Sequence, residues 1–299
     1  MIATTGKPDQ AQHSAGEIET RIGVELRNIG IPPRPAILSR IDAELHKDQP
    51  DFNMLADVIS SDVGLAASVI KVSNSPYFGF NGKVRSVMEA LLVLGLKVTV
   101  HTIAGIALQR TFPRIPSLER FWDSTARTAR VCGWLAVRFK GRTKLRPDDA
   151  YTFGLFRDCG IPLLMIPFPE YPEILRQANN ETERLFTAIE DEHLSINHAL
   201  IGSEMAEEWR LPTEIHDAIR HHHDVAALTG ALAGSLNLKT REFIAIAQIG
   251  EYLIQQCTGQ NRTQEWGKLG EAAMQQFDVS SAELDALVGE SREVITAEL

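Results

Sequence analysis

The chain has 299 residues, of which 44% are hydrophobic, and a formal net charge of −9. This length supports one large domain or two modest domains with a substantial core. The acidic residues are spread along the chain, which argues against sequence-independent binding to the phosphate backbone of nucleic acids. Cys132, Cys159 and Cys257 are far apart and odd in number, so they predict free thiols in a reducing cytoplasm.

The N-terminal 17 residues are polar and are expected to form a flexible tail, because they lack the apolar core of a signal peptide or membrane anchor. The most apolar stretch, residues 86–108, is interrupted by charged residues and by Gly95. This pattern favours two buried helices over a transmembrane span. We therefore expect a cytoplasmic protein without membrane insertion.

Helical periodicity dominates the chain, and alternating strand patterns are nearly absent. The sequence predicts an all-α fold of two packed helical subdomains with additional helices at the C-terminus. The first subdomain is expected over residues 18–115. It begins with an amphipathic segment at 18–27, and the prolines of IPPRPAIL then impose an extended entry to a second helix near Ala36.

Helix starts and stops are marked within this first subdomain. Asp51 and Asp62 precede apolar runs and are predicted N-caps, whose side chains accept hydrogen bonds from the first free N–H groups of a helix. Ser86 and Glu89 have the spacing of a capping box, and Gly95 is placed to end that helix.

Asn74, Ser75 and Pro76 lie at the end of the short helix that Asp62 caps. Asparagine is a routine helix terminator and turn former, and proline follows it here. These three residues are therefore predicted to have a structural role, closing a turn between the two helical layers.

The second subdomain is expected over residues 116–225, with the proline-containing loop FPRIPSLERF as its boundary. The periodicity predicts helices at about 121–139, 148–159, 181–192, 196–210 and 212–223. Gly160 stands just beyond the second of these helices, where a glycine commonly ends a helix. Residues 226–299 are expected to form a C-terminal extension of two helices that packs on this subdomain.

The stretch AIRHHHD places three consecutive histidines, His221, His222 and His223, in a predicted helix. Successive helical residues are rotated by about 100°, so at most one or two of these side chains can point at a single ion. Ile215 and Ile219 share a helix face with His222. His222 is therefore the histidine most expected to point inward.

Two further polar residues, His198 and Asp158, lie on apolar helix faces. His198 is followed by small and apolar residues at helical spacing, and Asp158 shares a face with Tyr151 and Leu155. A single buried histidine is more often a hydrogen-bonded core residue than a ligand. Because Asp158, His198 and His222 come from three predicted helices, their convergence predicts a polar pocket.

The motifs follow one another in a recognisable order. IPPRPAIL, LADVISSDVGLAASVIKVSNSPYFG and SVMEALLVLG are followed by FWDSTARTARVCGWLA, AYTFGLFRDCGIPLL and NHALIGSEMAEEWRLPTEIHDAIRHHHD. Over about residues 25–225 this series resembles the HDOD family, bacterial signalling domains related to the HD phosphohydrolases and HD-GYP phosphodiesterases. The resemblance implies that the second subdomain is HD-like.

The resemblance also implies a metal-ligand set that this chain keeps only in part. In the related hydrolases a histidine, a His-Asp pair, later histidines and a closing aspartate hold the metal. Matched in order, the corresponding residues here are Ser124, Arg157, Asp158, His198, His222, His223 and Gln248. Two imidazoles are replaced and one carboxylate becomes a neutral amide. Arg157 is permanently cationic and opposes a divalent cation, so we expect no metal and no cofactor.

The leading functional hypothesis is a non-catalytic signal-transduction module that acts through an unidentified signalling partner or a small regulatory ligand, alone or as a homo-oligomer. An alternative is a metal-dependent phosphohydrolase or phosphodiesterase whose altered site uses Asp158, His198, His222 and His223. A third hypothesis is an anion or nucleotide site at Arg157, since guanidinium pairs well with phosphate. Internal pairing of Arg157 with a carboxylate is the simpler expectation for that side chain.

Overall fold

The computed structural model of the protein describes residues 29–74, 83–112, 116–260 and 262–296. Within these ranges the regular structure is helical, and the β-pairing found there is a single isolated bridge between Lys140 and Thr143. The predicted all-α fold is confirmed. The predicted tail and first amphipathic segment fall outside the described residues, as do Ser75 and Pro76.

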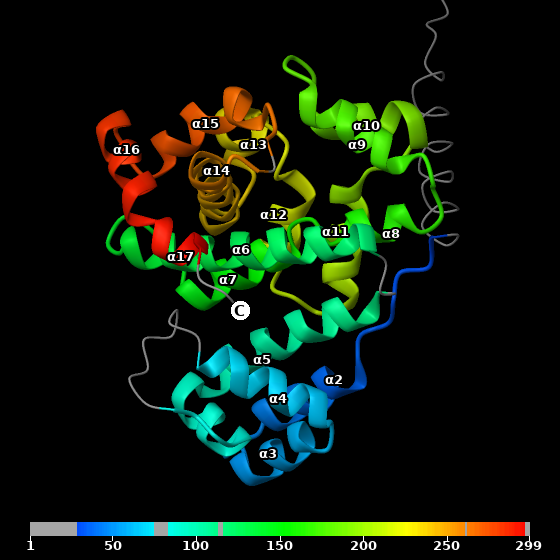
Figure 1. Cartoon of the computed structure of the whole chain (residues 1–299), viewed down its shortest axis with the longest axis vertical. Helices are drawn as coiled ribbons and strands as arrows, with labels where there is room; N and C mark the ends of the chain where they lie inside the picture. The colour runs from blue at the N-terminus through cyan, green and yellow to red at the C-terminus, as the bar shows by residue number, and fades with distance from the viewer. Residues whose placement is uncertain (1–28, 75–82, 113–115, 261, 297–299) are drawn as a thin grey trace, which may run out of the picture.

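The N-terminal helices form a small group below the rest of the molecule in Figure 1. They are α2 (Ala36–Leu45), α3 (Phe52–Ser60), α4 (Val63–Ser73) and α5 (Val87–Thr111). The predicted N-caps are present: Asp51 accepts a hydrogen bond from the Asn53 N–H at 2.9 Å, and Asp62 accepts one from the Leu65 N–H at 2.8 Å. These bonds satisfy N–H groups that have no partner inside the helix.

The break in α5 occurs at Gly95, as the sequence predicts. Gly95 has φ +74° and ψ 166°, so the element consists of two helices joined at this residue. The first belongs to the lower group, and the second runs along the junction with the upper part of Figure 1. By length and hydropathy α5 could cross a membrane, but half of its most apolar 18-residue window is buried inside the protein. This burial fits a core helix.

Asn74 holds the end of α4 to the segment that precedes α5. Its side-chain N–H donates to the Val84 carbonyl at 2.9 Å, and its Oδ1 accepts from the Val84 N–H at 2.9 Å. Val84 is nearly fully buried. The contact therefore lies within the N-terminal group, and the prediction that Asn74 closes a turn between the two layers is wrong.

We expect Asn74→Ala to lower the free energy of unfolding by about 1–3 kcal/mol, because it leaves a buried N–H and carbonyl of Val84 without partners. Asn53→Ala is the control, since Asn53 is exposed on α3 and should change stability by less than about 0.5 kcal/mol. Urea denaturation of the two variants measures both values. Equal stabilities would contradict this role.

The upper part of Figure 1 begins with a long helix and continues through shorter ones. In chain order they are α6 (Pro116–Arg138), α7 (Pro147–Phe156), α8 (Gly160–Met165), α9 (Tyr171–Asn180), α10 (Phe186–Leu194), α11 (His198–Glu208) and α12 (Thr213–His221). The boundary loop is shorter than predicted, because the chain is helical from Pro116. The helix predicted to reach residue 159 ends at Phe156, and Gly160 begins α8 instead of terminating α7.

The C-terminal extension contains more helices than the two predicted. They are α13 (Ala226–Thr229), the 3-10 helix η2 (Ala231–Gly234), α14 (Leu238–Thr258), α15 (Glu265–Gln276), α16 (Ser281–Glu290) and α17 (Arg292–Thr296). The Ser280 side chain accepts a hydrogen bond from the Glu283 N–H at 3.2 Å, which starts α16 as a separate element. The prediction of two helices is therefore wrong, and this cap accounts for one of the additional helix starts.

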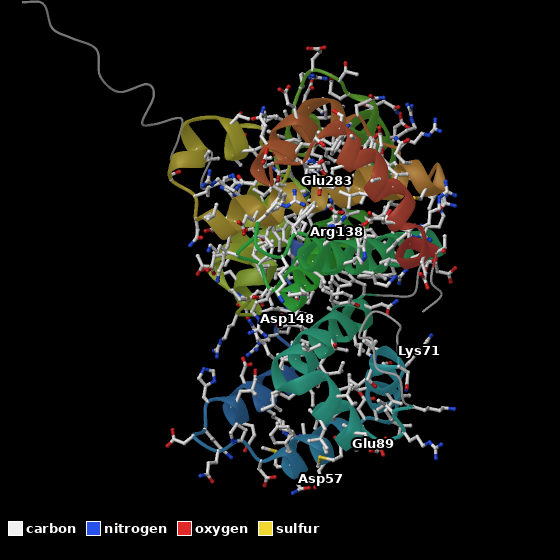
Figure 2. All side chains as sticks on the ribbon, turned by 90° about the vertical axis from the view of Figure 1, so that its left-hand side faces the viewer. Asp57, Lys71, Glu89, Arg138, Asp148 and Glu283 are labelled. Atoms are coloured by element: carbon white, nitrogen blue, oxygen red, sulfur yellow. The ribbon has the colours of Figure 1, made fainter. Side chains whose placement is uncertain are left out.

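The C-terminal helices pack against the helices that precede them. Helix α14 contacts α6, α12 and α15, and its central residues are almost completely buried. Ion pairs between Arg138 and Glu290 at 2.8 Å and between Arg142 and Glu283 at 2.5 Å join the end of α6 to α16. Figure 2 shows Arg138 and Glu283 close together on this side of the molecule.

Candidate functional site

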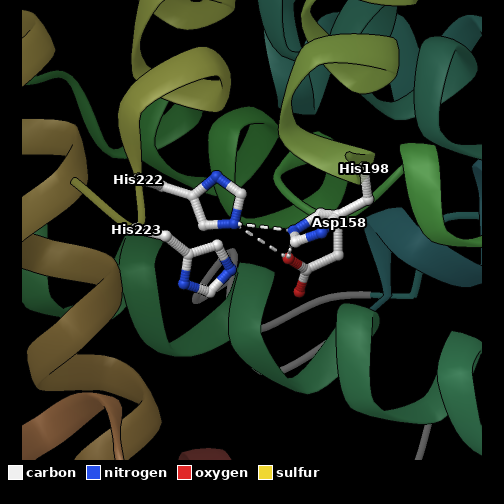
Figure 3. A group of neighbouring side chains, drawn as sticks. All are labelled: Asp158, His198, His222 and His223. Atoms are coloured by element: carbon white, nitrogen blue, oxygen red, sulfur yellow. Dashed lines mark hydrogen bonds and ion pairs between the residues drawn. The ribbon is translucent and has the colours of Figure 1, made fainter. Parts of the chain in front are cut away.

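Asp158, His198, His222 and His223 come together at the ends of helices (Figure 3). Asp158 lies in the turn after α7, His198 is the first residue of α11, and His222 and His223 follow the last residue of α12. The sequence pattern predicts that these residues lie within helices, whereas Asp158, His222 and His223 lie just beyond helix ends. Because α12 ends at His221, both of the histidines that follow it can point inward, and both are buried.

The ligand-capable atoms of this four-residue cluster lie within 4.8 Å of one another. His222 Nε2 is 3.2 Å from both His198 Nε2 and Asp158 Oδ1, and His198 Nε2 is 3.7 Å from that same oxygen. Ligand atoms about 2.0–2.1 Å from a tetrahedral zinc ion stand roughly 3.4 Å apart. The residues present therefore fit a single divalent cation in their spacing.

A second ring of acceptors fixes how the three imidazoles point. His198 Nδ1 lies 2.8 Å from Glu190, His222 Nδ1 lies 2.7 Å from the Ile219 carbonyl, and His223 Nδ1 lies 2.6 Å from Glu265. A carbonyl or carboxylate oxygen only accepts, so each Nδ1 carries the proton. Each neutral imidazole therefore keeps its lone pair on Nε2, which is the arrangement that second-shell partners give to metal-binding histidines.

The pKa values of the three histidines differ because their surroundings differ. Burial lowers the pKa of His222 to about 3, with His223 adding to the effect, and burial also lowers the pKa of His223. Burial lowers the pKa of His198 as well, but the Glu190 carboxylate reverses this and leaves it raised. His198 therefore protonates most readily of the three, and its Nε2–H can then donate to the lone pair of His222.

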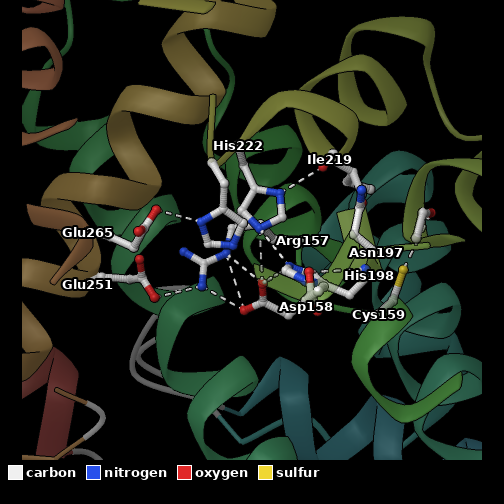
Figure 4. Close-up of polar contacts among 12 residues, drawn as sticks. Arg157, Asp158, Cys159, Asn197, His198, Ile219, His222, Glu251 and Glu265 are labelled. Carbon is white, nitrogen blue, oxygen red and sulfur yellow. Dashed lines mark hydrogen bonds and ion pairs between the residues drawn. The ribbon is translucent and has the colours of Figure 1, made fainter. Parts of the chain in front are cut away.

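Arg157 is buried and pairs with two carboxylates (Figure 4). Its Nη2 is 2.6 Å from Asp158 Oδ2 and 2.7 Å from Glu251 Oε1, and its Nε is 3.2 Å from both oxygens of Asp158. Burial raises the pKa of Asp158, but the charge of Arg157 outweighs it and holds that pKa well below its usual value. The simpler expectation, internal pairing of Arg157, matches this geometry.

The other residues matched to the ligand set lie around the cluster in different ways. Gln248 is buried on α14, and its side-chain N–H donates to the His222 carbonyl at 3.4 Å. Ser124 is half-buried on α6, and its place in the pocket stays a prediction. Gln248 thus supports the backbone of a cluster residue.

Three carboxylates of the site were missed by the sequence analysis: Glu190, Glu251 and Glu265. Glu251 follows Gln248 by three residues in an otherwise apolar run, which is a usable signal for a buried acid. Glu190 and Glu265 stand among other polar residues and are separated from their histidines by 8 and 42 residues. Nothing in the sequence pattern distinguishes them from surface acids.

Gly160 allows the turn that carries Asp158 to approach the start of α11. A Cβ atom placed on Gly160 would lie 2.0 Å from the His198 carbonyl oxygen and 2.9 Å from the Gly202 nitrogen. Both are backbone atoms, so no side-chain rotation can relieve the contact. The glycine therefore sets the separation between Asp158 and His198.

Comparison with known proteins agrees with this architecture. The HDOD domain family matches residues 31–225, which is well over half of the chain. The chain belongs to the HDOD family. A protein of Treponema pallidum (strain Nichols), named only as uncharacterized, is 28% identical over 208 residues. That match covers 65% of this chain and 38% of the relative, so the chain spans less than half of the relative's length.

Solved structures share the HDOD fold with this chain. An HDOD domain protein of unknown function from Geobacter sulfurreducens has a TM-score of 0.63 at 23% identity, covering 94% of this chain and 99% of its own. A protein of Shewanella amazonensis SB2B named "Putative phosphohydrolase" has a TM-score of 0.66 at 18% identity, covering 90% and 94%. At these identities the likeness shows the fold alone.

Proposed function

We propose that this HDOD domain is a non-catalytic regulatory module of signal transduction, which acts by binding a protein partner or a small regulatory ligand. The observation that carries the proposal is the buried ion-pair network of Arg157, Asp158 and Glu251. Arg157 takes the position that the family resemblance assigns to a coordinating histidine. It also engages both oxygens of the adjacent aspartate, so a fixed cation competes for the carboxylate that a metal would need.

Burial of the cluster supports the same conclusion. His198 and His222 have no exposed surface, and His223 is 7% exposed. Metal-dependent hydrolysis requires a phosphoryl group and a nucleophilic water to reach the ion together. The Asp158 side chain is 22% exposed, so the cluster is open on the side of that carboxylate alone among its four members. This limited access favours a structural or switching role over turnover.

We expect no hydrolysis of p-nitrophenyl phosphate or bis(p-nitrophenyl) phosphate above the rate without protein, with Mn²⁺, Fe²⁺, Mg²⁺ or Zn²⁺ added. The reason is that the proposed site offers no activated water to a substrate. Asp158→Asn tests the cluster, and Asp123→Asn is the control because Asp123 is exposed on α6. Turnover that survives in Asp123→Asn and disappears in Asp158→Asn would overturn the proposal.

A second candidate function is a metal-dependent phosphohydrolase with an altered site. The spacing of the Nε2 and Oδ1 atoms favours it, since Asp158, His198, His222 and His223 together supply four ligands of the types that zinc and manganese accept. A divalent ion held by these residues would supply Lewis-acid chemistry, which lowers the pKa of a bound water and polarises a phosphoryl oxygen. The outer acceptors Glu190 and Glu265 would then orient the ligating imidazoles.

Elemental analysis separates the two candidates independently of activity. The regulatory proposal predicts no stoichiometric metal in the purified protein, in His222→Gln or in His221→Gln. His221 is the matched control, because it neighbours the cluster in sequence but lies outside it. One metal ion per chain in the wild type and in His221→Gln, lost in His222→Gln, would establish a metal site and favour the second candidate.

A further inference from the structure

A second cavity lies where the N-terminal group meets the HD-like part, away from the histidine cluster. Its volume is about 310 Å³, near the lower end of the roughly 300–1,000 Å³ that small-molecule sites occupy. Its walls come from α2 with the preceding Arg34, from α5 after Gly95, and from the link Trp209–Pro212 between α11 and α12. In Figure 2 the junction lies at the level of the labelled Asp148.

Arg34 gives this junction cavity unused hydrogen-bonding capacity. Its side chain is only 10% exposed, and its Nη2 pairs with Asp42. The Nε and Nη1 atoms are buried without an acceptor among the described residues. A buried guanidinium with unmatched N–H groups is costly, so each such group calls for an explanation, and an absent anionic ligand supplies one.

Two further residues of the junction cavity, His101 and Arg210, can also donate hydrogen bonds to an anionic ligand. His101 is 8% exposed, and its Nδ1 makes no hydrogen bond within the described residues, although Asp148 Oδ2 lies 3.9 Å away. Arg210 is exposed, and it also lines a neighbouring cavity with Glu204, Glu207 and Glu208. It has φ +57°, a left-handed conformation that glycine adopts at lower cost at a helix end. Arginine at this position therefore points to a role for its side chain.

The charge count indicates what kind of anion fits. Arg34 is paired with Asp42, and Lys97 is paired with Asp149 at 2.9 Å, so those charges are already compensated. Arg210 adds one positive charge to the lining. Arg210 is thus the one lining cation outside these two ion pairs, and the nearby Glu204, Glu207 and Glu208 reduce the net positive charge, so a monoanion such as a carboxylate fits better than a phosphate dianion.

The remaining residues of the cavity wall indicate the chemical character of the part of the ligand beyond its charged group. Most of the other lining residues are apolar, among them Leu38, Val100 and Trp209. A cavity with apolar walls and a few convergent polar groups is the usual form of a small-molecule site. We propose that the junction cavity binds a small organic carboxylate, with its head at Arg34 and Arg210 and its apolar body against these walls.

Such a ligand contacts both parts of the molecule at once. Trp209 already joins them, because its Nε1–H donates to the Pro32 carbonyl at 3.0 Å. The wall it belongs to ends at Pro212, directly before α12, and α12 ends directly before His222 and His223. Occupancy of the cavity would therefore fix the N-terminal group on the helices that carry the histidine cluster. The inference goes beyond the proposed function and holds whether or not that cluster binds metal.

Binding of 3-phenylpropanoate and of its neutral amide to the full chain tests the proposal by calorimetry. We expect saturable binding of the acid and at least about tenfold weaker binding of the amide, because hydrogen bonds to a charged group are the stronger ones. Arg34→Gln should remove this preference. Val100→Trp should abolish binding of both probes by filling the apolar wall.

Two more variants complete the experiment: one tests Arg34 without replacing it, and the other is a control. Asp42→Asn releases Arg34 from its partner and should tighten binding of the acid, even if Arg34→Gln fails to fold. Arg110→Gln is the matched control, because Arg110, on α5, likewise pairs with a carboxylate, Asp62, but lines a different cavity. No saturable binding, equal affinity for acid and amide, or the same loss in Arg110→Gln as in Arg34→Gln would overturn the proposal.

Discussion

Gly160→Ala should lower the free energy of unfolding by about 3 kcal/mol, because overpacking typically costs about 1–3 kcal/mol and contact with rigid backbone puts this site at the upper end. The added methyl carbon would lie 2.0 Å from the His198 carbonyl oxygen, so α8 and α11 must move apart. That movement separates Asp158 from His198. We therefore expect the cluster geometry and the stability to be lost together, which urea denaturation and histidine NMR shifts can measure.

Gly267→Ala is the matched control for this substitution. Gly267 lies in α15, is exposed, and has no atom within 4 Å of the position that a Cβ would take. Alanine there should stabilise the protein by up to about 1 kcal/mol, because glycine is a poor helix former. A Gly160→Ala variant as stable as the wild type would show that the two helices are not held at the described separation.

Arg157→Met should lower the free energy of unfolding by about 3–5 kcal/mol, which is the usual cost of removing one partner from a buried ion pair. The variant leaves the carboxylates of Asp158 and Glu251 in the interior without their shared cation. Stability should therefore fall most at neutral and alkaline pH, where both carboxylates are charged. Denaturation with urea across pH 5–8 measures the effect.

A double variant and a surface variant show whether burial is the cause. Arg157→Met combined with Glu251→Met should recover part of the loss, because one stranded charge is removed and apolar volume replaces it. Arg176→Met breaks an exposed pair with Glu173 and should cost less than about 1 kcal/mol. Equal effects of Arg157→Met and Arg176→Met would mean that the buried network contributes little to stability.

The helix starts of the N-terminal group could be predicted from sequence because their causes are local. Asp51 and Asp62 bond to N–H groups two or three residues ahead, and Gly95 needs only its own left-handed conformation to break a helix. Interactions of this range are visible in any window of a few residues. Helix faces also indicated that Asp158, His198 and His222 converge, and the family resemblance added His223.

The environment of the site could not be predicted in the same way. Whether His223 points inward depends on α12 ending at His221, and its partner Glu265 is 42 residues away on another helix. The position of Gly160 in the sequence predicts a helix end, but in the structure its missing side chain allows the backbone of α11 to pack closely against it. Each of these features depends on which surfaces meet after the helices have formed.

The sequence by itself determined the all-α class and the capped helices, because periodicity and capping are properties of neighbouring residues. Only the tertiary structure decided that Arg157 is neutralised by Asp158 and Glu251, and that the Nδ1 atoms of His198 and His223 face carboxylates. The physical reason is that the cost of a buried charge depends on partners that chain packing brings together.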